Sequence, residues 1–335
     1  MRRYGVSSGE RGALDGWRHA CVRAVHEDGS HRRHPLRSGK SALPVAAITV
    51  PRDAGAQPVR PDPVAPRRRK WREIGGTQCQ HCCVTERALS FGPVASAYER
   101  FRPGYPDDLV DEVLAYAGRP VRTALEIGAG TGKATRVFAS RGIAVTATDP
   151  DPAMLLELRK HVPGTVRAVP AAFEDLPLTP AYDLVFAAAS LHWTRPDQRW
   201  TRVAAMLRPG GIFASFGGQL DLADPTVERT VRAAQAHVLA DAGVPSPDGT
   251  PAHSPMQWPG TELLKSERFT DVRQSTIERR IALSAGDYLG HLSTISAYLE
   301  LSETVRADVF DRIRAVLPER VTLMADLTLH LARLG

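Results

Sequence analysis

The 335-residue chain is poor in cysteine, lysine and aromatic residues. It has four cysteines, 5 lysines against 38 arginines, and only 6% aromatic residues. Cys79, Cys82 and Cys83 cluster around His81, but no second ligand pair follows at zinc-finger spacing, so we expect no metal site. So few cysteines argue against a disulfide framework and favour a reducing compartment.

Long apolar runs are also absent. No stretch approaches the roughly 18 consecutive apolar residues of a membrane helix, and residues 4–16 lack the apolar core of a signal peptide. We therefore expect a cytoplasmic protein without a membrane partner. Its 43% hydrophobic residues suffice for a sizeable core.

Positive charge is concentrated at the N-terminus. The formal net charge is +6, but residues 1–90 carry an excess of nine basic residues and the remainder is mildly acidic. Because residues 1–83 show no regular apolar period, we predict a disordered basic leader there and a folded domain over residues 84–335. The basic run at residues 67–70 is interpreted as a solvated charge run, with phosphate contacts or a targeting signal as the alternative.

The most informative stretch, residues 126–133, reads E-I-G-A-G-T-G-K. It joins an apolar run at residues 121–127 to a helical pattern at residues 134–140, which predicts a strand, a tight glycine turn and a helix. A phosphate-binding P-loop needs glycine at position 127 and Ser or Thr at position 134, and the dinucleotide fingerprint needs glycine at position 133. The sequence has Ile127, Ala134 and Lys133 there, so both motifs fail.

The remaining pattern, E-x-G-x-G-x-G, resembles the first motif of the class I S-adenosylmethionine (SAM)-dependent methyltransferases. The resemblance implies that the cofactor turn consists of Glu126, Gly128, Ala129, Gly130 and Gly132. SAM carries an ammonium and a sulfonium but no phosphate, so an acid suits its cationic end. Taken alone, this motif also fits an ordinary tight turn.

The N-terminal part of the domain carries a second family feature. Residues 95–106, A-S-A-Y-E-R-F-R-P-G-Y-P, resemble the Y-x-x-x-R-P-x-Y-P segment of small-molecule methyltransferases of the trans-aconitate methyltransferase type. The resemblance implies that this segment covers the cofactor, with Tyr98, Arg102 and Tyr105 orienting the SAM carboxylate or an acidic substrate. Simple packing of an N-terminal arm is the alternative. The segment from Val84 also resembles the opening of such enzymes, so translation starting at Val84 is a further hypothesis.

A second strand is predicted at residues 143–148, and it ends at Asp149. This acid lies 17 residues after Gly132 and matches the acid that binds both ribose hydroxyls in Rossmann-like sites. The resemblance places Pro150 and Met154 beside the adenine. Ala172 stands where many relatives carry an adenine-contacting Asp, so this contact is expected from the backbone of Phe173 or from Glu174.

The fourth strand, predicted at residues 182–189, leads to His192 and Trp193 at the edge where open α/β sheets bind ligands. His192 is the candidate catalytic residue because an imidazole can accept a proton near neutral pH. A structural, hydrogen-bonded histidine is the alternative. Trp193 is either a wall of the substrate pocket or part of the core.

The C-terminal half is less informative. The L-R-P-G-G turn at residues 207–211 and the strand at 212–216 are further family features. We then expect helices at 225–242, 261–269, 285–301 and 303–317, one strand at 272–283 and a final antiparallel strand at 323–331. Residues 219–269 form a candidate substrate lid or an exposed structural loop.

The resemblance covers residues 91–335 and implies an α/β fold. We expect a Rossmann-like, seven-stranded, mostly parallel sheet with helices on both faces and a final antiparallel strand. The expected function is methyl transfer from SAM to the O, N or C atom of a small molecule, a carboxylate among the candidates, by a monomer or homodimer. An RNA or DNA methyltransferase or nucleic-acid binder using the basic leader, or a non-catalytic SAM-binding protein, stays open.

Overall fold

The computed structural model describes residues 89–239, 246–251 and 253–335. The leader at residues 1–83, the proposed start at Val84 and the cysteine cluster lie outside these residues, so those interpretations stay predictions. None of the helices in the described part of the chain has the length and apolar character that a membrane span needs.

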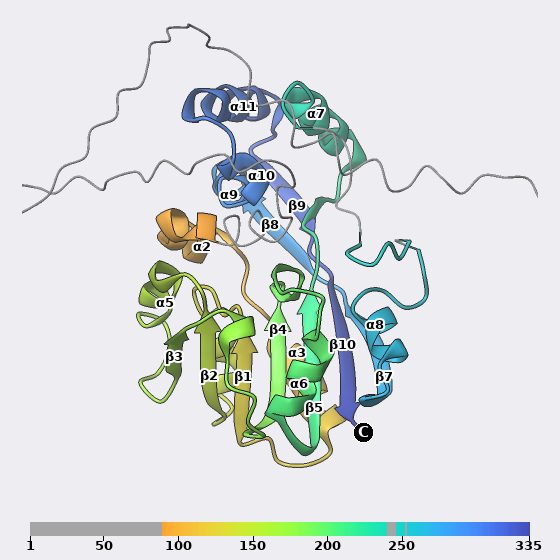
Figure 1. Ribbon diagram of the computed structural model, residues 1–335. Coiled ribbons are helices and arrows are strands. Elements are labelled where there is room, and N and C mark those ends of the chain that lie inside the picture. Colours follow the sequence, from red (N-terminus) through yellow and green to blue (C-terminus); the bar gives the residue numbers. More distant parts are fainter. Residues whose placement is uncertain (1–88, 240–245, 252) are drawn as a thin grey trace, which may run out of the picture. The chain divides into compact units, whose positions relative to one another are not determined.

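A seven-stranded sheet forms the centre of the domain (Figure 1). The strands are listed in spatial order: β3 (Arg167–Pro170), β2 (Ala144–Asp149), β1 (Thr123–Ile127), β4 (Tyr182–Ala188), β5 (Leu207–Gly217), β10 (Leu327–Leu334) and β7 (Phe269–Ile277). β1 to β5 pair in parallel, whereas β10 is antiparallel to both β5 and β7. The predicted fold class and the antiparallel final strand are confirmed.

Helices cover both faces of this sheet because its strands are apolar on both sides. One face is covered by α3 (Asp107–Ala117), α4 (Thr135–Ala139) and α5 (Pro152–Leu158). The other face is covered by η2 (Phe173–Asp175), η3 (Leu191–Trp193), α6 (Arg199–Met206) and α8 (Gly260–Lys265). Phe138 of α4 stacks on Phe186 of β4 at 4.3 Å between ring centroids, in the middle of the first face.

A second, three-stranded sheet lies beyond the carboxyl ends of the parallel strands (Figure 1). Its order is β6 (Asp221–Leu222), β9 (Arg320–Met324) and β8 (Arg280–Ser284). Each strand continues, after a short connection, a strand of the large sheet: β5 runs into β6, β7 into β8, and β9 into β10. We call these three connections the crossovers. The small sheet forms the cap, together with α7 (Pro225–Gln235), α9 (Ala285–Leu292), α10 (Ser296–Leu299) and α11 (Glu303–Val316).

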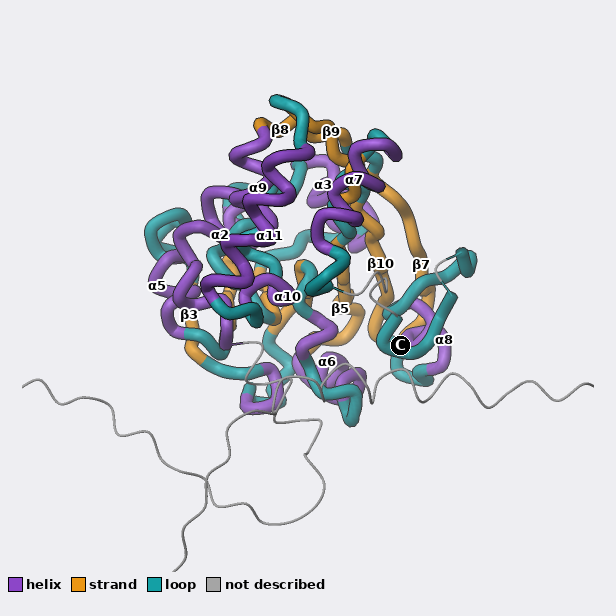
Figure 2. Tube along the Cα trace, turned by 90° about the horizontal axis from the view of Figure 1, so that it is seen from above, coloured by secondary structure: helices purple, strands orange, loops and turns teal. Residues whose placement is uncertain are grey.

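An N-terminal arm, residues 89–106, lies between the two parts (Figure 1), and Figure 2 shows its helix from above, beside α5 and α9. It contains η1 (Leu89–Val94) and α2 (Ala95–Phe101). Phe101 packs against Gly290 of α9, where an added Cβ would lie 2.5 Å from the ring. The arm therefore contacts the cap on one side and the large sheet's α5 on the other.

Two of the predicted strands are wrong, because each is interrupted by a crossover. Residues 272–283 and 323–331 each form two strands in two different sheets rather than one. The break occurs because Asp326 Oδ1 accepts the backbone N–H of Arg279 at 2.8 Å, which ties one crossover to another. This contact joins residues 47 positions apart, so apolar alternation along the chain carries no sign of it.

Several helix boundaries also differ. The predicted helix 285–301 is split into α9 and α10, because the Thr294 hydroxyl donates to the carbonyl of His291 at 2.7 Å and competes with the helical pattern. Residues 207–211 belong to β5 instead of forming a separate turn. α7 ends at Gln235, and Phe269 belongs to β7.

The candidate lid, residues 219–269, is divided between two environments. Its first part, β6 and α7, contributes Leu222 and Val231 to the core of the cap. Its last part, α8, buries Leu263 against the large sheet. The lid function itself stays a prediction.

Candidate active site

The glycine turn follows β1 at the carboxyl edge of the parallel strands. Gly128, Gly130 and Gly132 have φ values of 66°, 55° and 84°, in the left-handed region that favours glycine. A Cβ on Gly128 would lie 2.6 Å from Cβ of Ser190, whose hydroxyl donates to the carbonyl of Ile127. Gly128 is thus required both for its backbone conformation and for its close contact with Ser190, which follows β4.

Two buried acids flank this turn. Glu126, which is 1% exposed, accepts a hydrogen bond from the Thr135 hydroxyl and has no cationic partner among the described residues. Burial raises its pKa to about 8. The carboxylate of Asp149 accepts the backbone N–H of Gly130 and that of Asp151, both at 2.9 Å, and burial raises its pKa to about 6.

A cavity opens between the turn, the arm and the crossovers. The turn contributes Glu126, Gly128, Ala129 and Gly130 to its wall. Each crossover contributes as well: Gly218 to Leu220 from the first, Arg279 from the second, and Ala325 from the third, with Gly217 at the end of β5 and Leu327 at the start of β10 beside them. Ala188 and Ala189 end β4 beside it, and Ala189 has a left-handed φ of 53° although it is not glycine. Such backbone strain is frequent at functional sites.

The arm is fixed to the glycine turn through Glu99. Its carboxylate accepts the Thr131 hydroxyl at 2.6 Å and pairs with Arg136 at 2.6 Å, while Lys133 Nζ donates to its backbone carbonyl at 2.6 Å. These partners hold the pKa of Glu99 below its usual range although burial opposes this shift. The arm is therefore held over the turn by a partly buried ionic cluster.

Three predicted residues of the arm line the cavity, namely Tyr98, Arg102 and Tyr105. Arg102 Nε donates to the Thr294 hydroxyl at 2.8 Å, Nη2 donates to the Thr294 carbonyl at 3.0 Å, and the guanidinium lies 5.2 Å from the Tyr98 ring centroid. Burial raises the pKa of both tyrosines, and Glu126 contributes to the shift at Tyr105. The structure thus brings the arm residues together with Glu126.

The predicted adenine contacts lie apart from this cavity wall. Met154 is buried, with its methyl 3.4 Å from the position of a Cβ on Gly130, and Pro150 follows Asp149 at the end of β2. Phe173 is buried in the core of the second face. Glu174 accepts the backbone N–H of Arg195 at 2.7 Å. Their adenine-binding role stays a prediction.

His192 and Trp193 are not brought to the cavity wall. His192 is exposed and lies 4.7 Å from the Trp193 ring between centroids. Trp193 in turn meets Phe91 of the arm edge-on at 6.0 Å. The roles expected for these two side chains stay predictions, and the geometry gives the imidazole no direct position in the cavity.

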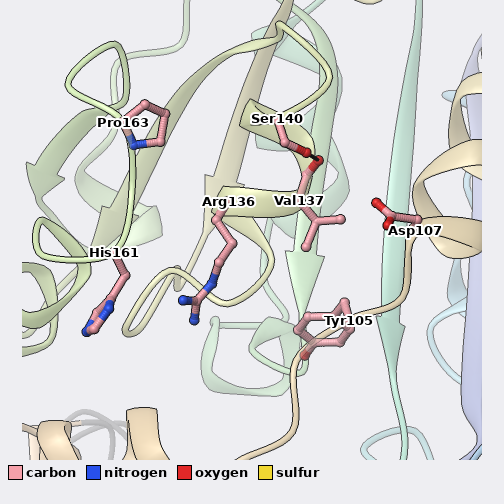
Figure 3. Close-up of a pocket in the computed structure, with 7 residues that line it drawn as sticks. All are labelled: Tyr105, Asp107, Arg136, Val137, Ser140, His161 and Pro163. Atoms are coloured by element: carbon pink, nitrogen blue, oxygen red, sulfur yellow. Dashed lines mark hydrogen bonds between the residues drawn. The ribbon is translucent and has the colours of Figure 1, made fainter.

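A more open hollow lies outside the turn (Figure 3). Its charged side chains already have partners: Arg136 pairs with Glu99, His161 with Glu157, and Asp107 with Arg141. Only Tyr105 lines both hollows. The cavity at the crossovers is therefore the candidate active site.

Comparison with known proteins agrees with this geometry. The family described as "Methyltransferase domain" matches residues 125–215, from β1 into β5. An uncharacterized methyltransferase of Mycobacterium bovis is 34% identical over 237 residues, which cover 70% of this chain and 88% of that protein. The chain belongs to the SAM-dependent methyltransferases.

Two further similarities are more limited. Trans-aconitate 2-methyltransferase of Acidovorax is 35% identical over 121 residues, which cover 35% of this methyltransferase and 46% of that enzyme. A phosphoethanolamine N-methyltransferase of Haemonchus contortus, solved in complex with SAM, gives a TM-score of 0.44 at 16% identity, covering 77% of this chain and 60% of that one. The family assignment rests on the sequence relatives.

The residues of the cavity fit SAM, which is the cofactor of this methyltransferase. The buried, cation-free carboxylate of Glu126 suits the positively charged methionyl end, because an opposite charge compensates the cost of its burial. Asp149 does not line this cavity itself but bonds to Gly130 of its wall, and it offers a carboxylate at the end of β2, where Rossmann-like sites bind a ribose diol. Neither acid has an ion pair within the described structure.

Two features escaped the sequence reasoning. Glu99 lies in the arm motif, and Lys133 occupies the position where a dinucleotide-binding turn needs glycine. The two residues meet only because the arm folds back over the turn. Arg279 lies within a stretch that was predicted as one strand, and its place in the cavity depends on the crossover. No local pattern marks any of these three residues.

Proposed function

We propose that this methyltransferase moves the methyl group of SAM to a small-molecule acceptor bound in the cavity at the crossovers. The observation that carries this proposal is the position of the cavity, which adjoins the glycine turn and is bounded by the arm and by the crossovers. A bounded site of this kind favours a small ligand over a polymer. The trans-aconitate methyltransferase similarity supports the same substrate class.

In this proposal the turn and the acids hold the cofactor. Gly128, Gly130 and Gly132 shape the turn, Glu126 binds the methionyl ammonium, and Asp149 binds the ribose. When bound, SAM supplies a methyl group that its sulfonium has already activated. The protein's own residues then have to orient the acceptor and exclude water, which is the role we give to the arm and the crossovers.

Apart from Glu126, the cavity wall offers three side chains that can act as bases, namely Tyr98, Tyr105 and Lys133; burial raises the pKa of both tyrosines, and Lys133 is bonded to Glu99. This composition favours an acceptor that is already nucleophilic, such as a carboxylate, over one that must lose a proton. The O, N or C identity of the methylated atom remains part of the proposal, as do the cytoplasmic location and the monomer or homodimer.

The test is product formation. The full chain is incubated with methyl-labelled SAM and a panel of small carboxylic acids, amines and phenols, and labelled products are identified by mass. We expect label in a small molecule with wild type and none with Glu126→Gln, with Glu303→Gln of α11 as an exposed control. Label that enters only RNA or DNA would contradict the proposal.

A further inference from the structure

Two guanidinium groups in the cavity have no acidic partner. Arg102 reaches it from the arm and Arg279 from the connection between β7 and β8. Arg279 Nη1 donates to the backbone carbonyl of Gly104 at 3.0 Å, and neither arginine forms an ion pair with a described residue. Asp326 of the third crossover, which accepts the backbone N–H of Arg279, pairs with the side chain of Arg280 instead.

Their surroundings leave this charge uncompensated. Burial lowers the pKa of both arginines, and each is flanked by tyrosines rather than carboxylates. Arginine stays charged in proteins, and a partly buried cation without a counter-ion is costly. The planar guanidinium binds carboxylate and phosphate oxygens in a two-pronged geometry. A cavity with two such groups is suited to two anionic groups.

The two arginines belong to different sides of the cavity. Arg102 lies beside Tyr98, whose pKa is raised by burial and also by Asp149, the proposed ribose-binding acid. Arg279 is fixed on the crossover side, where Asp326 holds its backbone N–H. Tyr105 interacts electrostatically with both arginines and with Glu126. Because SAM brings one carboxylate, only one of the two arginines is needed for the cofactor.

We infer that the methyl acceptor carries an anionic oxygen group, a carboxylate or a phosphate, which Arg279 binds while Arg102 binds the carboxylate of SAM. This inference rests on the proposed function and adds the chemical class of its acceptor. Arg279 is then a specificity-determining residue, supplied by the crossover. Tyr105 also lines the cavity and interacts electrostatically with both arginines, so we assign its hydroxyl as an additional donor to the acceptor.

The experiment separates the two arginines by calorimetry. S-Adenosylhomocysteine is titrated into the full-length wild type and into Arg279→Gln, Arg102→Gln and Arg273→Gln. The last variant is the matched control, an exposed arginine of β7 that pairs with Asp271. Trans-aconitate, fumarate and phosphoethanolamine are then each titrated into the nucleoside-saturated proteins. Thermal melting of every variant checks that it is folded.

We expect at least one anion to bind wild type and Arg273→Gln, and to bind Arg279→Gln at least tenfold more weakly. The affinity of Arg279→Gln for S-adenosylhomocysteine should change less than threefold, whereas that of Arg102→Gln should fall tenfold or more. Binding of phosphoethanolamine alone identifies a phosphate subsite, and binding of the carboxylic acids alone identifies a carboxylate subsite.

Two outcomes overturn the inference. Either no anion binds wild type saturated with S-adenosylhomocysteine, or Arg279→Gln loses nucleoside affinity and anion affinity alike. In the first case, binding of S-adenosylhomocysteine to the wild type would still support the proposed function. A wild type that fails to bind the nucleoside contradicts the proposed function instead.

Discussion

Glu126 is the residue whose protonation depends most directly on the cofactor. Burial raises its pKa to about 8, so at pH 7 the carboxyl is mostly protonated in the ligand-free protein. Because this value exceeds the unfolded one, the folded state holds an extra proton between about pH 4.5 and 8. The stability of the ligand-free protein should therefore fall as pH rises through this window. A bound cation favours the ionised form and opposes that loss.

Cofactor binding should consequently release a proton from Glu126. At pH 7 we expect calorimetry in buffers of different ionisation enthalpy to detect release of about one proton per bound SAM. Glu126→Gln, which cannot ionise, should release almost none and should bind more weakly. Equal proton release by wild type and variant would show that Glu126 does not contact the cationic end.

His192 should matter little to the chemical step. Its side chain is exposed and does not line the cavity. A general base contributes about 10²–10⁴-fold to a rate, whereas we expect His192→Ala to retain kcat within about tenfold, with an unchanged pH profile. Steady-state kinetics across pH 5.5–9 with the identified acceptor provides the measurement. A larger loss, together with disappearance of a limb near the histidine pKa, would restore the catalytic role.

At the scale of elements, the arm acts as the cover of the cofactor turn. Glu99→Gln removes the charge that Lys133 and Arg136 share, so α2 should detach more easily from α4. We expect about a tenfold weaker affinity for SAM and faster hydrogen exchange in residues 95–101. Glu303→Gln serves as the control because it lies exposed on α11. Unchanged exchange in α2 would mean that other contacts hold the arm.

Elements that depend on local sequence signals were predictable, whereas the breaks within strands and helices were not. The glycine turn and the parallel strands were predictable because apolar runs and glycine spacing are local signals. Residues 272–283 look like one strand because β-branched residues such as Val272, Ile277 and Ile281 lie on both sides of the break at Arg279, with no glycine or proline between them. The break depends on Asp326, and the helix break at Thr294 depends on a side-chain hydroxyl. The cavity is lined by residues 217–220, Arg279, Ala325 and Leu327, which lie at or beside the strand breaks. The sequence therefore did not predict this part of its wall.

For the whole molecule, the crossovers couple the cap to the sheet and so to the active site. The first crossover passes very close to the third, since a Cβ on Gly218 would lie 1.9 Å from the carbonyl oxygen of Asp326. Backbone leaves little freedom to relax, so Gly218→Ala should lower the free energy of unfolding by about 1–3 kcal/mol. Gly164→Ala is the control, because nothing lies within 4 Å of its added Cβ. Equal melting temperatures for the two variants would contradict this close packing.

The central claim is that the glycine turn and its two acids bind SAM. Calorimetric titration of the full chain with SAM, S-adenosylhomocysteine and NAD⁺, repeated with Asp149→Asn, tests this claim most directly. We predict micromolar or tighter binding of the two sulfur nucleosides, at least tenfold weaker binding by Asp149→Asn, and no binding of the dinucleotide. Tight binding of NAD⁺ without heat from either sulfur nucleoside would contradict the account.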